Sequence, residues 1–243
     1  MTKIEYYLAC LYCRFRFRFN LNALSKVEVG PFAGLKLCSA GSWGGHRARL
    51  IGTYEKELAG VIESIPLLGI NHILDVGCAD GYYACGFAFK YPLVDVTAYD
   101  LSRRARWCTY SASKANKLLD RVLIEKFFDV KDYPSRLDKR DLLFLDCEGF
   151  EAEIITSETV SKFINAAILV ECHDFVVANV TESLSLILQA SHHLQFIQSR
   201  DRTVEDIPAN LPYRPSILSD IQEGRPNTMT WIWAIPKSWM IPA

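Results

Sequence analysis

The sequence of 243 residues has no apolar run that could cross a membrane. Its clearest N-terminal run, residues 6–13, falls well short of the ~20 residues that a spanning helix needs. No convincing signal-peptide cleavage site follows that run. Internal repeats and low-complexity segments are also lacking, which excludes solenoids and linker-like chains. Half of the residues are apolar, so we expect one large domain with a sizeable core, with or without an extension.

The cysteines offer no complete zinc site. Cys10 and Cys13 form the one suggestive pair among eight cysteines, and no second cysteine pair or suitably spaced histidine pair accompanies them. The chain is also too long and too rich in core residues to depend on disulfides. We therefore expect a reduced, cytoplasmic protein.

A strong overall charge is missing, but charge is concentrated locally. The formal net charge is −1, yet residues 1–50 carry eight bases and two acids, a net of +6. The rest of the chain therefore has a net of −7. Such an acidic body disfavours binding to nucleic acid. The basic arm could instead cover a pocket, mediate a homo-oligomer contact or hold the protein against an anionic membrane or glycan.

From residue 71 onward, apolar runs that are typical of strands alternate with helical patterns. This alternation predicts an α/β fold with a mostly parallel sheet and helices on both faces. We therefore divide the chain into a basic N-terminal extension at 1–69, with helices and a short β element, and a larger domain at 70–243. Residues 201–227 are rich in proline and charge, and we interpret this long connection as a substrate lid. The expected strands are 72–77, 95–99, 122–127, 141–145, 166–170, 194–198 and 229–235.

The strongest local signal is a glycine-rich turn between the first of these strands and a helix. Asp75, Gly77, Ala79 and Gly81 lie in the stretch 73–82, and Asp100 ends the next strand, where a carboxylate can accept hydrogen bonds from a ribose. A dinucleotide site would need glycines at two further positions, which Ala79 and Tyr82 occupy. The pattern instead resembles the acid-x-Gly-x-Gly-x-Gly signature of class I S-adenosylmethionine-dependent methyltransferases, with Ala79 replacing the middle glycine.

That resemblance implies roles for these residues. Residues 77–81 would line the methionine part of S-adenosylmethionine, and Asp100 would hold its ribose. Asp129 would receive the adenine amino group. The implied architecture is a Rossmann-like methyltransferase fold with a seven-stranded sheet.

A second signature lies further along the chain. Residues 142–155 contain Asp146-Cys147-Glu148-Gly149, and residues 168–173 end in Glu171-Cys172-His173. These stretches resemble the Asp-x-Glu-Gly-x-Glu and Glu-x-His patterns of the FkbM-like methyltransferase family. The resemblance covers about residues 71–174. It implies transfer of a methyl group to a hydroxyl of a saccharide or another hydroxylated metabolite.

The candidate catalytic residues are Asp146, Glu148 and His173, because all three follow strands whose carboxyl ends meet at one edge of the sheet. We expect His173 to take the proton of an acceptor hydroxyl, since an imidazole titrates near neutrality. Asp146 or Glu148 would orient the imidazole or hold the substrate. A divalent ion held by Asp146 with Glu171, His173 or Asp174 is a less favoured alternative.

Other residues receive more limited interpretations. Glu151 and Glu153 lie in the first turn of a helix, where a carboxylate is favourable without any catalytic role. His46, Tyr54 and Glu55 lie in or after a glycine-rich loop and could reach the pocket. Two other functions remain as alternatives: a methyltransferase acting on protein or nucleic acid, and a non-catalytic scaffold that binds the cofactor.

Overall fold

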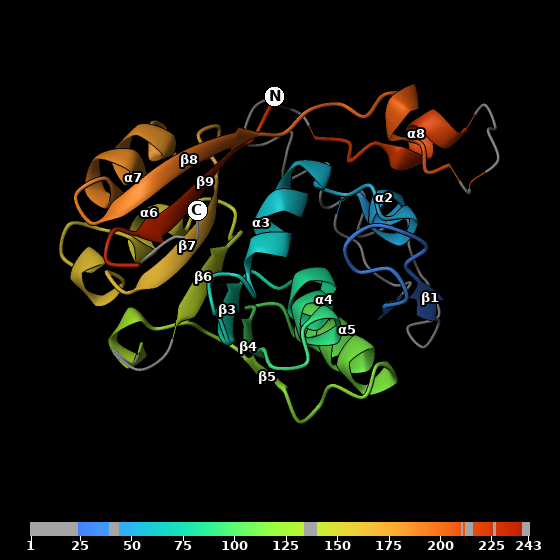
Figure 1. Ribbon diagram of the computed structural model, residues 1–243, viewed down its shortest axis with the longest axis horizontal. Helices are drawn as coiled ribbons and strands as arrows, with labels where there is room; N and C mark the ends of the chain where they lie inside the picture. The colour runs from blue at the N-terminus through green and yellow to red at the C-terminus, as the bar shows by residue number, and fades with distance from the viewer. Residues whose placement is uncertain are drawn as a thin grey trace.

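Figure 1 shows the computed structural model, which describes residues 24–38, 44–133, 140–209, 211, 216–225 and 227–239. Its centre is a seven-stranded sheet with the order β5-β4-β3-β6-β7-β9-β8. The first five of these are parallel, and β9 runs antiparallel to both β7 and β8. The predicted α/β fold with a mostly parallel seven-stranded sheet is therefore confirmed. The strands are β3 (His72–Val76), β4 (Asp95–Tyr99), β5 (Val122–Glu125), β6 (Asp141–Leu145), β7 (Ala166–Cys172), β8 (His192–Gln198) and β9 (Thr230–Pro236).

The central strands are buried on both faces, which explains their unbroken apolar sequences. All residues of β6 and β7 are buried. Helices α3 (Ala59–Ser64), α4 (Tyr82–Lys90) and α5 (Arg103–Ala115) lie on one face of the sheet. Helices α6 (Glu151–Ile154) and α7 (Val180–Leu188) lie on the other, to the left in Figure 1.

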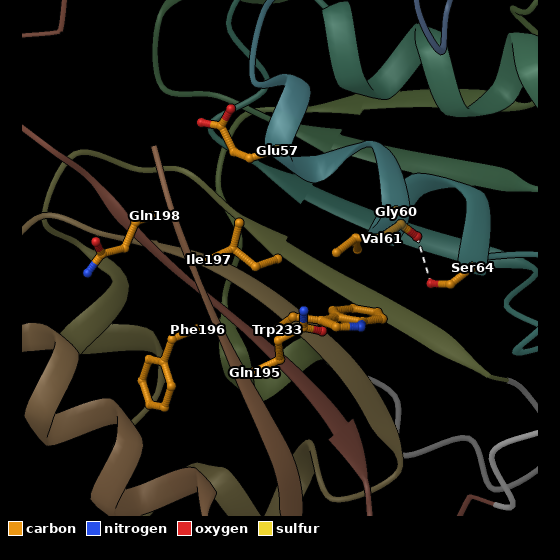
Figure 2. A pocket seen from close by; sticks show the side chains of 9 residues that line it. All are labelled: Glu57, Gly60, Val61, Ser64, Gln195, Phe196, Ile197, Gln198 and Trp233. Atoms are coloured by element: carbon orange, nitrogen blue, oxygen red, sulfur yellow. Dashed lines mark hydrogen bonds between the residues drawn. The ribbon is translucent and has the colours of Figure 1, made fainter. Parts of the chain in front are cut away.

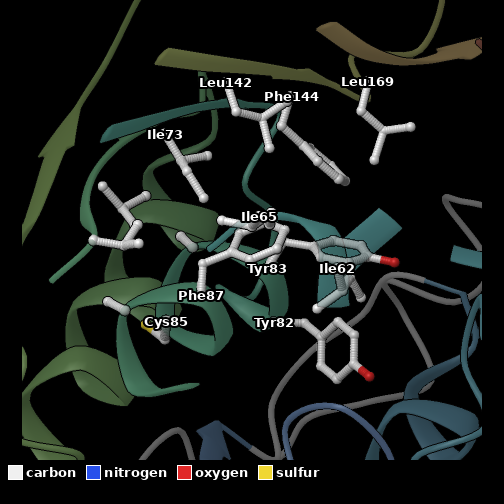
Figure 3. Packing of buried hydrophobic residues seen from close by; sticks show 14 of the residues in the cluster. Ile62, Ile65, Ile73, Tyr82, Tyr83, Cys85, Phe87, Leu142, Phe144 and Leu169 are labelled. Atoms are coloured by element: carbon white, nitrogen blue, oxygen red, sulfur yellow. The ribbon is translucent and has the colours of Figure 1, made fainter. Parts of the chain in front are cut away.

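The larger core lies between the sheet and α3 and α4. Figure 3 shows Tyr82, Tyr83 and Phe87 of α4 in this core together with Phe144 of β6. The rings of Tyr83 and Phe144 are 4.5 Å apart, close enough for a specific aromatic contact in addition to area burial. A turn of the N-terminal part adds Phe32, whose ring centroid lies 5.1 Å from that of Tyr82.

The N-terminal part of the described chain shares this core. It contains a hairpin of β1 (Leu24–Lys26) and β2 (Lys36–Cys38), then α2 (His46–Ile51) and the short 3₁₀ turn η1 (Lys56–Leu58). The core cluster around α4 includes apolar side chains on both sides of residue 69, so removal of the whole segment 1–69 would open it. The accessory role expected for the arm stays a prediction for residues 1–23, which lie outside the described residues.

The long connection before β9 carries two short elements. They are the 3₁₀ turn η4 (Val204–Asp206) and α8 (Ile217–Ile221). Two further 3₁₀ turns, η2 (Val130–Asp132) and η3 (Val160–Lys162), follow β5 and α6. Within the described ranges, no helix combines the length and the apolar character that crossing a bilayer requires.

Gly77 lies where the end of β3 meets the end of β6, the strand that leads into the second signature. Its φ is 97°, and a Cβ there would lie 1.8 Å from the carbonyl oxygen of Asp146. The Asp146 backbone N–H also donates to the Val76 carbonyl oxygen at 3.0 Å. The absence of a side chain at Gly77 therefore lets the ends of β3 and β6 meet.

We expect Gly77→Ala to lower the free energy of unfolding by about 3 kcal/mol, because the new methyl group must push the two strand ends apart. Gly224→Ala is the matched control, since Gly224 has a φ of 70° but open space around its Cβ position. It should lose only about 1 kcal/mol from the left-handed conformation. Urea unfolding measures both values, and equal losses would contradict the steric explanation.

Candidate functional site

The strand order reverses between β3 and β6, and this is where the predicted site residues gather. The chain proceeds from β3 to β4 and β5 on one side and then crosses to β6 and β7 on the other. Ligands of open α/β sheets bind at such a switch point, beyond the carboxyl ends of the strands. The predicted cofactor residues lie at the end of β3 or follow β3, β4 and β5, and the predicted catalytic residues follow β6 and β7.

The turn after β3 is held in an unusual backbone conformation. Gly77, Ala79 and Gly81 have φ angles of 97°, 47° and 83°. The middle position therefore favours glycine, and alanine adopts its left-handed conformation at a cost of roughly 1 kcal/mol. The departure at Ala79 from the glycine pattern thus leaves the expected turn intact. The Ala79 N–H points to Asp100, whose Oδ2 accepts it at 3.0 Å.

Asp100 retains the capacity to bind a ribose. Its Oδ1 accepts the Ser102 N–H at 2.7 Å and its Oδ2 accepts the Ala79 N–H. A carboxylate has about four lone-pair positions, so two remain for a pair of hydroxyls. Partial burial raises the pKa of Asp100 above its ordinary value. At β5, Oδ1 of Asp129 accepts the Lys131 N–H at 2.8 Å and thereby caps η2.

Asp75 lies beneath the turn rather than facing the solvent. Its side chain is buried, and burial together with the charge of Asp100 raises its pKa to about 8. At neutral pH the carboxyl of Asp75 is therefore mostly protonated. Its Oδ2 has no hydrogen-bond partner among the described residues.

The turn has a second support that the sequence did not reveal. The carboxylate of Asp80 is buried, and its Oδ2 lies 3.1 Å from the Arg49 Nη2 and 3.8 Å from the His46 Nδ1 of α2. Burial would raise the pKa of Asp80, but Arg49 and His46 hold it below its ordinary value. His46 thus lies next to Asp80 of the turn, and its expected reach into the cofactor pocket stays a prediction.

On the other side of the switch point, His173 is held by Glu151. The Nδ1 of His173 lies 2.9 Å from the Oε1 of Glu151, which also accepts the Cys147 N–H at 3.0 Å. Both side chains are buried, at 3% and 0% exposure. Glu151 therefore orients the imidazole, whereas the sequence suggested only a helix-terminus role for it. The exposed Glu153 agrees with that simpler interpretation.

Three carboxylates surround the other nitrogen of His173. The Nε2 lies 3.4 Å from Glu171, 3.6 Å from Glu148 and 3.7 Å from Asp146. Glu148, which has a φ of 58°, is half exposed, whereas Glu171 is buried. The structure thus brings together His173, Asp146 and Glu148 as predicted, and it adds Glu171 and Glu151.

This arrangement determines the protonation of the cluster. Burial alone would lower the pKa of His173, but the hydrogen bond to Glu151 and the charges of Glu171 and Glu148 raise it to about 9. Partial burial and the neighbouring Glu171 raise the pKa of Asp146 well above its ordinary value. At neutral pH His173 is therefore mostly an imidazolium, and Asp146 takes up a proton more readily than an ordinary aspartate.

A second cation, Arg225, binds the outer side of Glu171. Its guanidinium contacts Glu171, Glu55 and Glu223, with the Nε–Glu223 distance at 2.6 Å. Glu55 is also the acceptor of the Tyr83 hydroxyl, and burial together with Glu171 raises its pKa to about 8 despite Arg225. Arg225 therefore connects Glu55 to Glu171 of β7, and the expected position of Glu55 in the pocket stays a prediction.

The same network ties the long connection to the rest of the protein. Arg202 binds Glu57 at 2.6 Å and also contacts Glu223. The proline- and charge-rich composition of residues 201–227 marked this connection as functional, but only the structure pairs Arg225 with Glu171. Tyr213 and Arg214 of the predicted lid lie outside the described residues.

A shallow groove of about 580 Å³ lies on the face of the sheet next to α3. Figure 2 shows Trp233 and Ile197 beside Val61 and Gly60, with Glu57 at one end. None of the predicted catalytic or cofactor residues lines this groove. It is therefore separate from the strand-end site described above.

Among the described residues, one group has the composition and spacing of a metal site. The ligand atoms of Asp146, Glu171 and His173 all lie within 4.8 Å of one another. Carboxylate oxygens and an imidazole suit several divalent ions. His173 and Glu171 are already engaged with Glu151 and Arg225, however, so an ion would have to compete with those contacts.

Comparison of sequences identifies no family for the chain. No protein-family model matches it, and no curated protein matches it.

Several solved structures of similar fold are described as O-methyltransferases. One, from Klebsiella pneumoniae and provisionally assigned as an O-methyltransferase, has a TM-score of 0.53 at 11% identity, covering 79% of this chain and 86% of that chain. An O-methyltransferase from Bacillus cereus in complex with SAH has a TM-score of 0.51 at 13% identity, with coverages of 73% and 79%. The O-methyltransferase TomG from Streptomyces achromogenes, in complex with SAM and involved in tomaymycin synthesis, has a TM-score of 0.50 at 12% identity, with coverages of 72% and 78%. At these identities the likeness establishes the fold, and the chain has the Rossmann-like methyltransferase fold.

Proposed function

We propose that the protein is an S-adenosylmethionine-dependent O-methyltransferase that acts on a hydroxyl of a saccharide or another hydroxylated metabolite. The observation that carries this proposal is the Glu151–His173 pair, which lies at the end of β7. Asp146, whose Oδ1 lies 3.7 Å from the Nε2 of His173, meets the glycine-rich turn at Gly77. The FkbM-like sequence stretches support the same assignment. When bound, S-adenosylmethionine supplies an electrophilic methyl group.

In this proposal His173 removes the proton of the acceptor hydroxyl. Glu151 engages Nδ1, so Nε2 is the atom that faces the acceptor and takes the proton. The carboxylates near Nε2 stabilise the resulting imidazolium. A pKa of about 9 makes His173 a strong base, although only a small fraction is unprotonated at neutral pH.

The neighbouring carboxylates support a hydroxylated acceptor. Glu171, Glu148 and Asp146 present acceptor oxygens to a ligand, which suits a molecule with several hydroxyl donors. An anionic acceptor would be repelled, because Arg225 is already paired with three carboxylates. Arg225 and Glu151 act as positioning residues in this proposal, through Glu171 and His173.

Metal assistance is the second candidate, supported by the grouping of Asp146, Glu171 and His173. A divalent ion there would lower the pKa of a bound hydroxyl and would displace the proton from His173. A methyltransferase for protein or nucleic acid and a non-catalytic scaffold are the remaining alternatives. The acidic body, with a net charge of −7 beyond residue 50, disfavours nucleic acid.

We expect the purified protein to release S-adenosylhomocysteine when it is supplied with S-adenosylmethionine and a panel of saccharides and hydroxylated metabolites. His173→Ala should lower turnover by roughly 10²–10⁴-fold, because the base is lost. His193→Ala is the control, since His193 is exposed on the sheet edge.

Turnover that survives exhaustive chelation supports the imidazole alone, and turnover that requires an added divalent ion supports the metal. Near-wild-type turnover of His173→Ala would contradict the proposed base.

Cofactor binding should depend on the carboxyl end of β4. We expect Asp100→Ala to weaken binding of S-adenosylhomocysteine by roughly 10–100-fold in calorimetry, since a charged hydrogen-bond partner is lost. Asp95→Ala removes an exposed carboxylate from the opposite end of the same strand and should bind normally. Equal affinities for the two variants would refute the ribose assignment.

The pH dependence of the chelated enzyme tests the role of Glu151. Because a base works unprotonated, kcat/KM should rise about tenfold per pH unit below the pKa of about 9. Glu151→Gln removes the charge that raises this pKa, so the rise should shift to lower pH. Glu153→Gln, an exposed neighbour in α6, should leave the profile in place. A flat profile below pH 9 in the wild type would rule out His173 as the base.

A further inference from the structure

One side of α5 presents bases and aromatic rings to the solvent. Arg103, Trp107, Tyr110 and Lys114 recur at steps of four, three and four residues, so they lie on one side of the helix, and Lys117 follows its end. All five are exposed, with Trp107 at 36% and Tyr110 at 46%. We call these five residues the α5 stripe. Two large exposed aromatic side chains between bases are unusual for a purely solvated helix face.

The charge of this segment is entirely positive. Between Asp100 and Asp120 the chain contains five bases and no acid. In the described part of the structure, Arg103, Lys114 and Lys117 make no ion pair with a carboxylate. Their charges are therefore available to an anionic partner, in contrast to Arg49, Arg202 and Arg225 in the site.

The first described strand, β1, is connected through β2 to the helix that carries the α5 stripe. Leu24, the first described residue, pairs with Cys38 of β2, and Cys38 packs against Cys108 of α5, the neighbour of Trp107 in the chain. The Asn116 side chain also donates to the Lys36 carbonyl oxygen at 2.7 Å, which fixes β2 to the end of the same helix. Figure 1 shows β1 and α5 on the same side of the molecule. Residues 1–23, which precede Leu24 in the chain, contain four bases and one acid.

We propose that the α5 stripe binds the surface of an anionic phospholipid membrane. Arginine and lysine side chains are attracted to lipid phosphates, and tryptophan and tyrosine rings favour the interfacial region of a bilayer. A second copy of this chain is a poorer partner, because two positive stripes would repel each other. A long nucleic acid would extend from the stripe over an acidic body, whereas a flat membrane contacts only this side. The proposal is independent of the methyl acceptor.

Co-sedimentation of the full-length protein with vesicles tests the proposal. We expect binding to vesicles that contain phosphatidylserine, weaker binding at high salt, and little binding to vesicles of phosphatidylcholine alone. The triple variant Arg103→Gln/Lys114→Gln/Lys117→Gln should have a partition coefficient roughly 100-fold lower, since each lost base lowers it about fivefold. The control Lys131→Gln/Lys162→Gln/Lys237→Gln removes three positive charges from η2, η3 and the end of β9 and should lose much less.

A second measurement separates contact from general attraction. Brominated lipids should quench the tryptophan fluorescence of the wild type, and Trp107→Phe should lose part of that quenching while it keeps its melting temperature. Equal losses of binding in the two triple variants would overturn the proposal. So would binding to duplex RNA or DNA in place of vesicles, or self-association that depends on the stripe.

Discussion

The pairing of buried carboxylates with a few cations at one edge of the sheet is the constraint on which the rest of the structure depends. A carboxylate that leaves water without a partner costs several kcal/mol, roughly, or takes up a proton. Around His173 and Arg225 the structure uses both solutions. Glu151 and Glu171 contact the two cations, while burial and neighbouring carboxylates raise the pKa values of Asp146 and Glu55, so these two groups take up a proton more readily. The elements that supply these groups are far apart in the chain, so the charge balance also connects the N-terminal part, β7 and the long connection before β9.

The cofactor side of the switch point follows different physics. There the supporting carboxylate, Asp75, is buried with a raised pKa, and the turn is shaped by backbone conformation rather than by ion pairs. The one strong ion pair, between Asp80 and Arg49, lies behind the turn and ties it to α2. The turn and the charged cluster meet where the backbone of Gly77 approaches the backbone of Asp146. A turn shaped mainly by backbone conformation thus lies beside a cluster shaped by charge, and this division suits the two proposed roles of holding a nucleoside and moving a proton.

Local pattern was sufficient to predict most of the fold. The strands from residue 72 onward are continuous apolar runs, and parallel pairing follows from the helices between them. The pattern was less informative before residue 70: the short β element expected there is a hairpin of two three-residue strands, β1 and β2, and one of the expected helices begins as the 3₁₀ turn η1. In the site, the positions of the two motifs were enough to identify Asp146 and His173 as candidates. It did not distinguish Glu151 from Glu153, because both lie in one helical turn and only packing buries the first.

Arg225 marks the limit of inference from sequence in this protein. Nothing in its local sequence distinguishes it from the other charged residues of the segment 201–227, and its partners Glu55 and Glu171 are 170 and 54 residues away. Its position is nevertheless required by charge, because Glu171, Glu55 and Glu223 could not approach one another without a cation between them. The carboxylate of Glu171 is then shared, with Oε1 on Arg225 and Oε2 3.4 Å from the Nε2 of His173. Withdrawal of Arg225 from Glu171 would therefore change the charge close to His173, so the basicity of the proposed base depends on a residue of the long connection before β9.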